Sequence, residues 1–145
     1  MKRLAVFILL LLLLCGMDCF FKKDWNINSF FLNSDVEIYL STIENLNGGN
    51  IIKNGEGAIV CCKFNDLEKY LNLNNVLGFT IKVDGVQIDD VLQNLNPRNI
   101  SKAMNYTYGY TAQFNQFKCV NGNNFQMAAR ENSVLVGFPI LLGSY

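Results

Sequence analysis

The hydrophobic and polar residues of this chain follow two different periods. Apolar residues spaced three or four positions apart predict amphipathic helices, and apolar residues at every second position predict half-buried strands. Both patterns recur from Ser34 to Tyr145, and short turns rich in Gly, Asn and Asp separate them. The sequence therefore predicts one mixed domain in which helices pack against a sheet.

Three segments have the spacing of a helix. In the first, Ser34 and Glu37 fit a capping box, and Gly48 and Gly49 follow the last apolar residue. Its apolar face would consist of Val36, Tyr39, Leu40, Ile43 and Leu46. A strand through Val36, Ile38 and Leu40 competes with this helix but leaves Ile43 and Leu46 unexplained, so a helix is favoured.

The other two predicted helices are shorter. Asn65 and Glu68 would cap a helix at residues 65–71, whose inward residues are Leu67, Tyr70 and Leu71. The third helix follows the Asp84-Gly85 turn and stops at Asn96-Pro97. Its apolar face would consist of Ile88, Val91, Leu92 and Leu95.

Strand patterns occupy the remaining segments. Residues 51–52 and 57–64 flank Asn54-Gly55, a pair that favours a tight hairpin turn. Residues 76–83 alternate so that Thr80 and Lys82 would be exposed. The last third, from Ile100 to Tyr145, predicts a sheet of about four strands at residues 104–111, 114–120, 125–130 and 134–142. The expected fold class is α+β, a largely antiparallel sheet with about three helices packed on one face.

The N-terminus has the composition of an export signal. Lys2 and Arg3 precede an apolar run from Leu4 to Gly16, which is shorter than the ~20 residues of a spanning helix. Residues 1–19 are predicted to be a cleaved signal or an uncleaved membrane anchor, because the residues before Cys19 fit a signal-peptidase site poorly. Residues 20–33 would then form a linker, and residues 34–145 the domain.

Composition and charge exclude several classes of function. The formal net charge is zero and no basic block is visible, so nucleic-acid binding is not expected. The chain has no His, which excludes Ser-His-Asp and Cys-His catalysis and His-containing zinc sites. No glycine-rich phosphate loop is present, so we expect no cofactor, no metal site and no assembled catalytic group.

Carboxylates are the remaining catalytic candidates. Asp84, Asp89 and Asp90 lie close together in sequence, and paired carboxylates can perform acid and base chemistry. A structural interpretation competes and is favoured: Asp84 would form the turn, while Asp89 and Asp90 would stabilise the N-terminus of the following helix.

Three cysteines lie outside the export segment, at Cys61, Cys62 and Cys119. Neighbouring residues on a strand face opposite ways, so either Cys61 or Cys62, but not both, could form a disulfide with Cys119. Free cysteines that behave as small apolar residues are the alternative.

A row of tyrosines is the best candidate for ligand binding. Tyr106, Tyr108 and Tyr110 would project from one face of a strand, where they could stack on sugar rings or receive a peptide. Aromatic residues are also good strand formers that pair across strands, so a purely structural role competes.

The C-terminal third contains Tyr108-Gly109-Tyr110, the Asn121-Gly122 hairpin, residues 126–129 and the closing segment 136–145. In these features it resembles a set of small exported proteins of unknown function from low-GC Gram-positive bacteria. This resemblance implies a bacterial source and a secreted or envelope location, and it makes a disulfide less expected.

The expected function is an exported, non-catalytic domain outside the cytoplasmic membrane that binds a protein or cell-wall partner. Membrane contact would occur only through the N-terminal segment. The alternatives are a carboxylate-dependent envelope enzyme and a subunit of a membrane complex anchored by its N-terminus.

Overall fold

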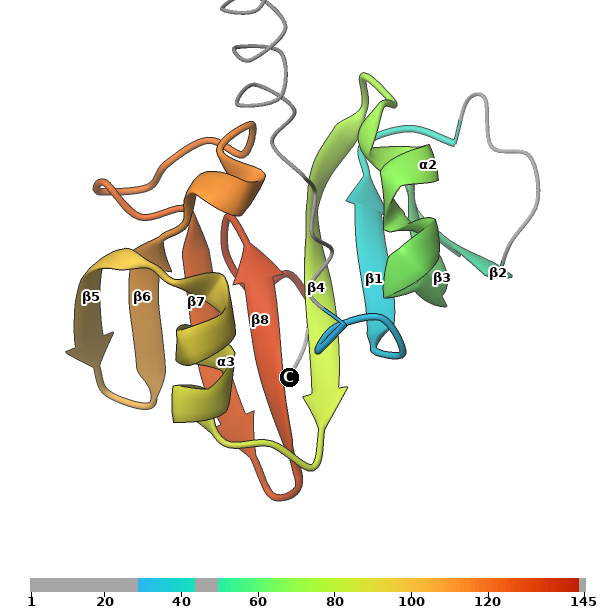
Figure 1. Ribbon diagram of the computed structural model, residues 1–145. Helices are drawn as coiled ribbons and strands as arrows, with labels where there is room; N and C mark the ends of the chain where they lie inside the picture. Colours follow the sequence, from blue (N-terminus) through green and yellow to red (C-terminus); the bar gives the residue numbers. More distant parts are fainter. Residues whose placement is uncertain (1–28, 44–49, 144–145) are drawn as a thin grey trace, which may run out of the picture.

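A computed structural model describes residues 29–43 and 50–143. Over these residues the chain forms an eight-stranded sheet with the strand order β2-β3-β1-β4-β8-β7-β6-β5 (Figure 1). All neighbouring strands pair antiparallel. The strands are β1 (Asp35–Leu40), β2 (Asn50–Asn54), β3 (Gly57–Lys63), β4 (Val76–Asp84), β5 (Arg98–Ala103), β6 (Tyr106–Tyr110), β7 (Phe125–Arg130) and β8 (Ser133–Phe138).

The described residues contain two α-helices, α2 (Leu67–Leu71) and α3 (Ile88–Leu95), and two 3-10 turns, η1 (Phe64–Asp66) and η2 (Ala112–Phe114). Figure 1 shows α2 and α3 on the same side of the sheet. The fold is therefore a mostly antiparallel sheet with few helices, which is an α+β or mainly β architecture. The expected set of three helices is wrong.

The helix predicted to begin at Ser34 is instead the strand β1. Val36, Ile38 and Leu40 are buried at alternate positions, whereas Ile43 is 37% exposed. β1 pairs with β3 on one side and with β4 on the other, so both edges of its backbone are hydrogen-bonded. β1 forms a strand because its pairing with β3 and β4 places its alternate residues in the core. This pairing joins residues far apart in the chain, so the local spacing does not encode it.

The other two predicted helices are confirmed, with one change in capping. The N-cap residue of α2 is Asp66, not Asn65, and its side chain makes no capping hydrogen bond. In α3 the backbone N–H of Gln87 donates to Oδ2 of Asp90 at 2.9 Å, within a capping box. The helix ends at Leu95, and its C-cap residue Asn96, directly before Pro97, has a left-handed φ of 44°.

The core lies on the face of the sheet that α2 and α3 cover. Alternate residues of the central strands meet there in register, for example Ile38 with Phe79 and Phe79 with Phe138. Leu67 of α2 and Leu95 of α3 belong to the same buried cluster. Phe31 is also part of it, at 1% exposed, so the predicted linker contributes a residue to the core.

Among the strand predictions, the Asn54-Gly55 hairpin, β4 and β7 are confirmed. The strand predicted at residues 134–142 is confirmed only in part, because β8 ends at Phe138 and residues 139–142 leave the sheet. Residues 114–120, predicted as a strand, form the last residue of η2 and the loop after it instead. Phe114 and Phe117 are both buried although they are three positions apart, which is not the period of a strand. The last third does contain four strands, because β5 precedes β6.

Asn124 holds this loop against the sheet. Its fully buried side chain accepts a hydrogen bond from the Thr111 N–H at 2.8 Å. It also donates to the carbonyl oxygens of Thr111 and Phe114, at 2.9 and 3.1 Å. The loop is thereby fixed over the core by contacts with backbone groups that would otherwise be left unpaired.

The predicted export segment, residues 1–19, lies outside the described residues, so its cleavage or anchoring stays a prediction. Within 29–43 and 50–143, no helix has the length and apolar character needed to cross a membrane.

Candidate functional site

The face of the sheet opposite the helices carries a continuous row of cross-strand neighbours. We call these eight residues the polar row and this side of the sheet the polar face. In strand order the polar row consists of Asn50, Cys61, Glu37, Thr80, Gly137, Gln126, Tyr108 and Ser101. Each residue is directly opposite the next on the adjoining strand, so the row spans all eight strands. Cross-strand neighbours on one face lie close enough to act on one ligand together.

The last part of the chain crosses this row at Gly137. After the cis peptide bond between Phe138 and Pro139, residues 139–143 turn back over the polar face, and we call them the C-terminal strap. A Cβ atom on Gly137 would lie 2.4 Å from the backbone of Ile140, and one on Gly78 would lie 2.3 Å from the carbonyl oxygen of Phe138. Both positions therefore require glycine to let the strap lie directly on the sheet.

Gln126 ties the strap to the polar row. Its Oε1 atom accepts a hydrogen bond from the Leu141 N–H at 3.0 Å, and its Nε2 donates to the Tyr108 hydroxyl at 3.2 Å. The strap thus divides the polar face into two halves, one around Glu37 and Thr80 and one around Tyr108.

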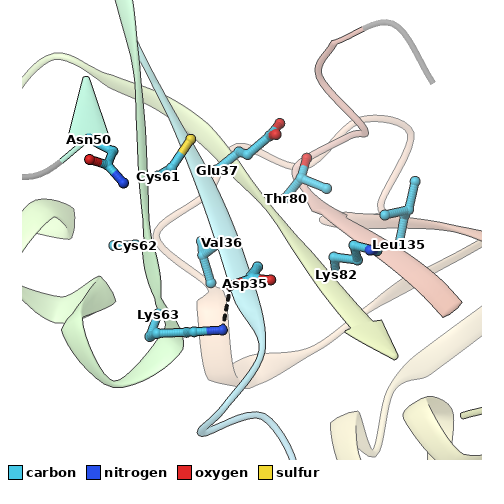
Figure 2. Close-up of a pocket in the computed structure, with 10 residues that line it drawn as sticks. All are labelled: Asp35, Val36, Glu37, Asn50, Cys61, Cys62, Lys63, Thr80, Lys82 and Leu135. Carbon is cyan, nitrogen blue, oxygen red and sulfur yellow. Dashed lines mark hydrogen bonds and ion pairs between the residues drawn. The ribbon is translucent and has the colours of Figure 1, made fainter. Parts of the chain in front are cut away.

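A cleft of about 460 Å³ lies in the first half (Figure 2). It is within the range of roughly 300–1,000 Å³ that is usual for small-molecule sites. Its lining residues come from β1, β2, β3, β4 and β8, and the cleft is named here after Glu37 and Thr80. Figure 2 shows the Cys61 sulfur, the Glu37 carboxylate and the Thr80 hydroxyl pointing to the same side of the sheet.

Thr80 is the unexpected residue of this cleft. The sequence pattern predicts an exposed Thr80, but its side chain is 2% exposed. Its neighbour across the strands is Gly137 and its neighbour two positions earlier on the same face is Gly78, both of which lie under the strap. The strap therefore covers the border of the cleft. The Thr80 Oγ1 atom is buried and has no hydrogen-bond partner among the described residues, which is rare for a buried polar group.

Charged groups of both signs line the cleft. Asp35 and Lys63 form an ion pair at 2.5 Å, which Figure 2 marks with a dashed line. Glu37 accepts a hydrogen bond from the Tyr39 hydroxyl at 2.7 Å. Lys82 contacts Asp84 at 3.3 Å in a pair in which both side chains are more than half exposed. The cleft thus offers a carboxylate beside Thr80 and an ammonium group one row away.

The cysteines near the cleft are not activated thiols. Burial, followed by the negative charges of Glu37 and Asp35, raises the pKa of Cys61. Burial, followed by the charge of Asp66, raises the pKa of Cys62 to about 11. Reactive thiols need a lowered pKa, so both groups are protonated at neutral pH and suit neither nucleophilic nor redox catalysis.

The structure has Cys61, Cys62 and Cys119 as free thiols. Cys61 faces the polar face on β3, Cys62 faces the core, and Cys119 is exposed in the loop after η2.

In the folded protein, iodoacetamide at pH 7 should modify Cys119 faster than Cys61 or Cys62, because only thiolates react and Cys119 is exposed. The rate at Cys62 should keep rising with pH up to about 11, where its thiol ionises. Quantifying each alkylated peptide by mass spectrometry measures the three rates separately. Similar rates for the three thiols in denaturant are the control, and a faster reaction at Cys61 than at Cys119 would contradict the expectation.

The second half of the polar face carries the predicted tyrosine row. Tyr106, Tyr108 and Tyr110 are half-buried and project from the polar face, because Thr107 and Gly109 between them face the core. The Tyr106 and Tyr108 rings lie 6.4 Å apart. Gly109 is needed for packing, since a Cβ atom there would lie 2.5 Å from the Phe125 ring.

Tyr108 lines a hollow of about 310 Å³, which we call the tyrosine hollow. Two asparagines of the Asn121-Gly122 turn region and two residues of the strap share it: Asn121, Asn123, Pro139 and Ile140. Two exposed apolar side chains also line it, Val120 at 48% and Ile140 at 38% exposed. An aromatic ring, amide groups and exposed aliphatic side chains together are typical of a binding surface.

Two of the three aspartates considered for catalysis have structural contacts, and the third lies at the start of a helix. Asp84 pairs with Lys82, Asp90 accepts the capping hydrogen bond from Gln87, and Asp89 is exposed in the first turn of α3. These are the positions that the turn and helix interpretation predicts. The carboxylates that do share a cleft are Asp35 and Glu37, which the sequence pattern did not single out because it placed Glu37 in a helix.

Within the part of the chain that the structure describes, no three Cys, Asp or Glu residues are grouped in a way that could hold a metal ion. Comparisons with protein-family models, with curated proteins and with solved structures found no match for this chain. The proposals below therefore rest on the residues and their geometry.

Proposed function

We propose that this chain is an exported, non-catalytic domain that binds a protein or cell-wall partner outside the cytoplasmic membrane through its polar face. The observation that carries the proposal is the tyrosine hollow, where Tyr108, two asparagines and exposed aliphatic side chains surround one concave site. Aromatic faces and amide groups are the chemistry that recognises sugar rings and extended peptides. The export-type N-terminus supports the location.

The chemistry of the polar face favours binding over catalysis. The Cys61 thiol is held in its protonated form, and Asp35 is paired with Lys63. A second candidate, a carboxylate-dependent envelope enzyme, is favoured only by Asp35 and Glu37 sharing a cleft. Turnover of an envelope substrate that is lost in Glu37→Gln and retained in Asp89→Asn would favour the enzyme.

The proposal predicts that the protein sediments with purified cell-wall sacculi or captures an envelope protein. Replacing Tyr108 with serine should lower the fraction of protein that sediments with sacculi at least tenfold, because the Tyr108 ring lines the tyrosine hollow. Sedimentation of the purified full chain with sacculi, followed by gel densitometry, measures this fraction. If the partner is a protein, cross-linking in intact envelopes measures its capture by the parent protein and by Tyr108→Ser.

The matched control is Met104→Ser at the turn between β5 and β6, where the side chain is 99% exposed. Binding should be unchanged in this variant. Equal retention of Tyr108→Ser and the parent protein, by sacculi and by envelope proteins alike, would show that the tyrosine hollow is not the binding surface.

A further inference from the structure

We propose that the cleft at Glu37 and Thr80 binds a zwitterionic peptide about two residues long, with its ammonium group at Glu37 and Thr80 and its carboxylate at Lys82. This inference rests on the proposed function, because it assigns a ligand class to the same polar face. It concerns the half of that face on the other side of the strap from the tyrosine hollow.

The first step of the argument is the Thr80 hydroxyl. Its Oγ1 atom is buried at the border of the cleft and has no partner within residues 29–43 and 50–143, and such a group is costly to leave without a hydrogen bond. A hydroxyl can both accept and donate, so it can accept from a ligand ammonium group. Val would fill the same space without this cost, so the hydroxyl is best explained by a partner that enters the cleft.

The second step is the charge next to Thr80. Glu37 is its cross-strand neighbour, and Figure 2 shows the two polar groups on the same side of the sheet. Cys61, the neighbour of Glu37 on β3, contributes no second negative charge because its thiol stays protonated at neutral pH. One carboxylate and one hydroxyl acceptor together suit a single ammonium group.

The third step is a lysine further along the same face of β4. Lys82 is two residues beyond Thr80 on β4, which places its backbone roughly 7 Å further along the strand. An extended dipeptide spans at most about 7 Å, whereas a single amino acid spans half of that. The Lys82–Asp84 pair is exposed and therefore weak, so a ligand carboxylate can replace Asp84 as the partner of Lys82.

The test is isothermal titration calorimetry of the purified full chain in mild detergent with the dipeptide Ala-Ala. Binding is expected, and it should weaken at least tenfold when the amine is acetylated, when the carboxylate is amidated, or when alanine replaces the dipeptide. Glu37→Gln and Lys82→Gln should each weaken binding about tenfold, while Asp89→Asn and Lys102→Gln, which lie outside the cleft, should not change it.

Thr80→Val gives a readout that a purely structural role would not produce. This variant should bind Ala-Ala at least tenfold more weakly than the parent protein. Its midpoint of thermal unfolding should stay equal to or above that of the parent protein, because the substitution removes a buried hydroxyl that had no hydrogen-bond partner. Thr107→Val, the same change on the helix-covered face, should leave binding intact. A folded Thr80→Val variant that binds Ala-Ala normally would overturn the assignment.

Two further outcomes would also overturn it: no heat with Ala-Ala up to millimolar concentration, or equal affinity for alanine and Ala-Ala. Either result leaves the proposed function standing if Tyr108→Ser still reduces the fraction bound to sacculi. Conversely, dipeptide binding without any sacculus or envelope partner would support the cleft and contradict the tyrosine hollow.

Discussion

Replacing Phe79 with alanine is expected to lower the free energy of unfolding by about 3–5 kcal/mol. Phe79 is 0% exposed, and its ring centroid lies 5.1 Å from Phe114, 5.1 Å from Phe117 and 4.9 Å from Phe138. Truncation would leave a cavity where the loop after η2, β4 and β8 meet. Urea denaturation followed by circular dichroism measures the change.

Leu77 provides the matched control for this prediction. It lies on the same strand, two positions before Phe79, and is 58% exposed. Leu77→Ala should cost less than about 1 kcal/mol, as expected for a surface substitution. A loss of similar size in both variants would contradict the position of Phe79 at the centre of the core.

Asn124→Ala is expected to lower the free energy of unfolding by about 2–4 kcal/mol. The change leaves the buried N–H and carbonyl groups of Thr111 without the partners that Asn124 supplies, and each unsatisfied buried group costs roughly 1–3 kcal/mol. The loop after η2 should also become more mobile. Hydrogen exchange of residues 111–124, measured by mass spectrometry, checks this part of the expectation.

Asn115 in the same loop is exposed and gives the comparison. Asn115→Ala should change stability by less than about 0.5 kcal/mol. If Asn124→Ala is equally mild, the hydrogen bonds to Thr111 do not hold the loop in place.

The error at β1 shows how a local pattern can fit two structures. Val36 and Leu40 satisfy both a helix and a strand, and the choice of helix depended on Ile43 and Leu46. Ile43 turns out to be more than a third exposed, and Leu46 lies outside the described residues. Only the pairing of β1 with β3 and β4 decides between the two, and those partners are distant in sequence.

β5 was not predicted because its sequence has no local pattern, whereas the sequence of β1 fits two patterns. It is an edge strand in which all six residues are exposed, so it has no alternation of apolar and polar positions to detect. Its pairing with β6 is also interrupted between Arg98 and Ser101, and Asn99 has a positive φ of 54°. Charged residues such as Lys102 on an exposed edge oppose aggregation through that edge.

The two halves of the candidate site differ in how far the sequence revealed them. The alternation of Tyr106, Tyr108 and Tyr110 was enough to place them on one face, because the period of a strand is local. The cleft at Glu37 and Thr80 was not visible. It needs β1 between β3 and β4. At its border, Thr80 lies beside Gly78 and Gly137, which the strap can approach closely only because they lack side chains.

The sequence by itself determined the features that depend on near neighbours or on composition: the hairpin turns, α2 and α3, the face of the tyrosine row, and the absence of histidine chemistry. The export-type N-terminus stays a prediction. The tertiary structure decided the identity of β1, the existence of β5, the path of the loop held by Asn124, and the burial of the Thr80 hydroxyl. The physical reason is that these features are set by cross-strand pairing and by the C-terminal strap, whose contacts join residues far apart in the chain.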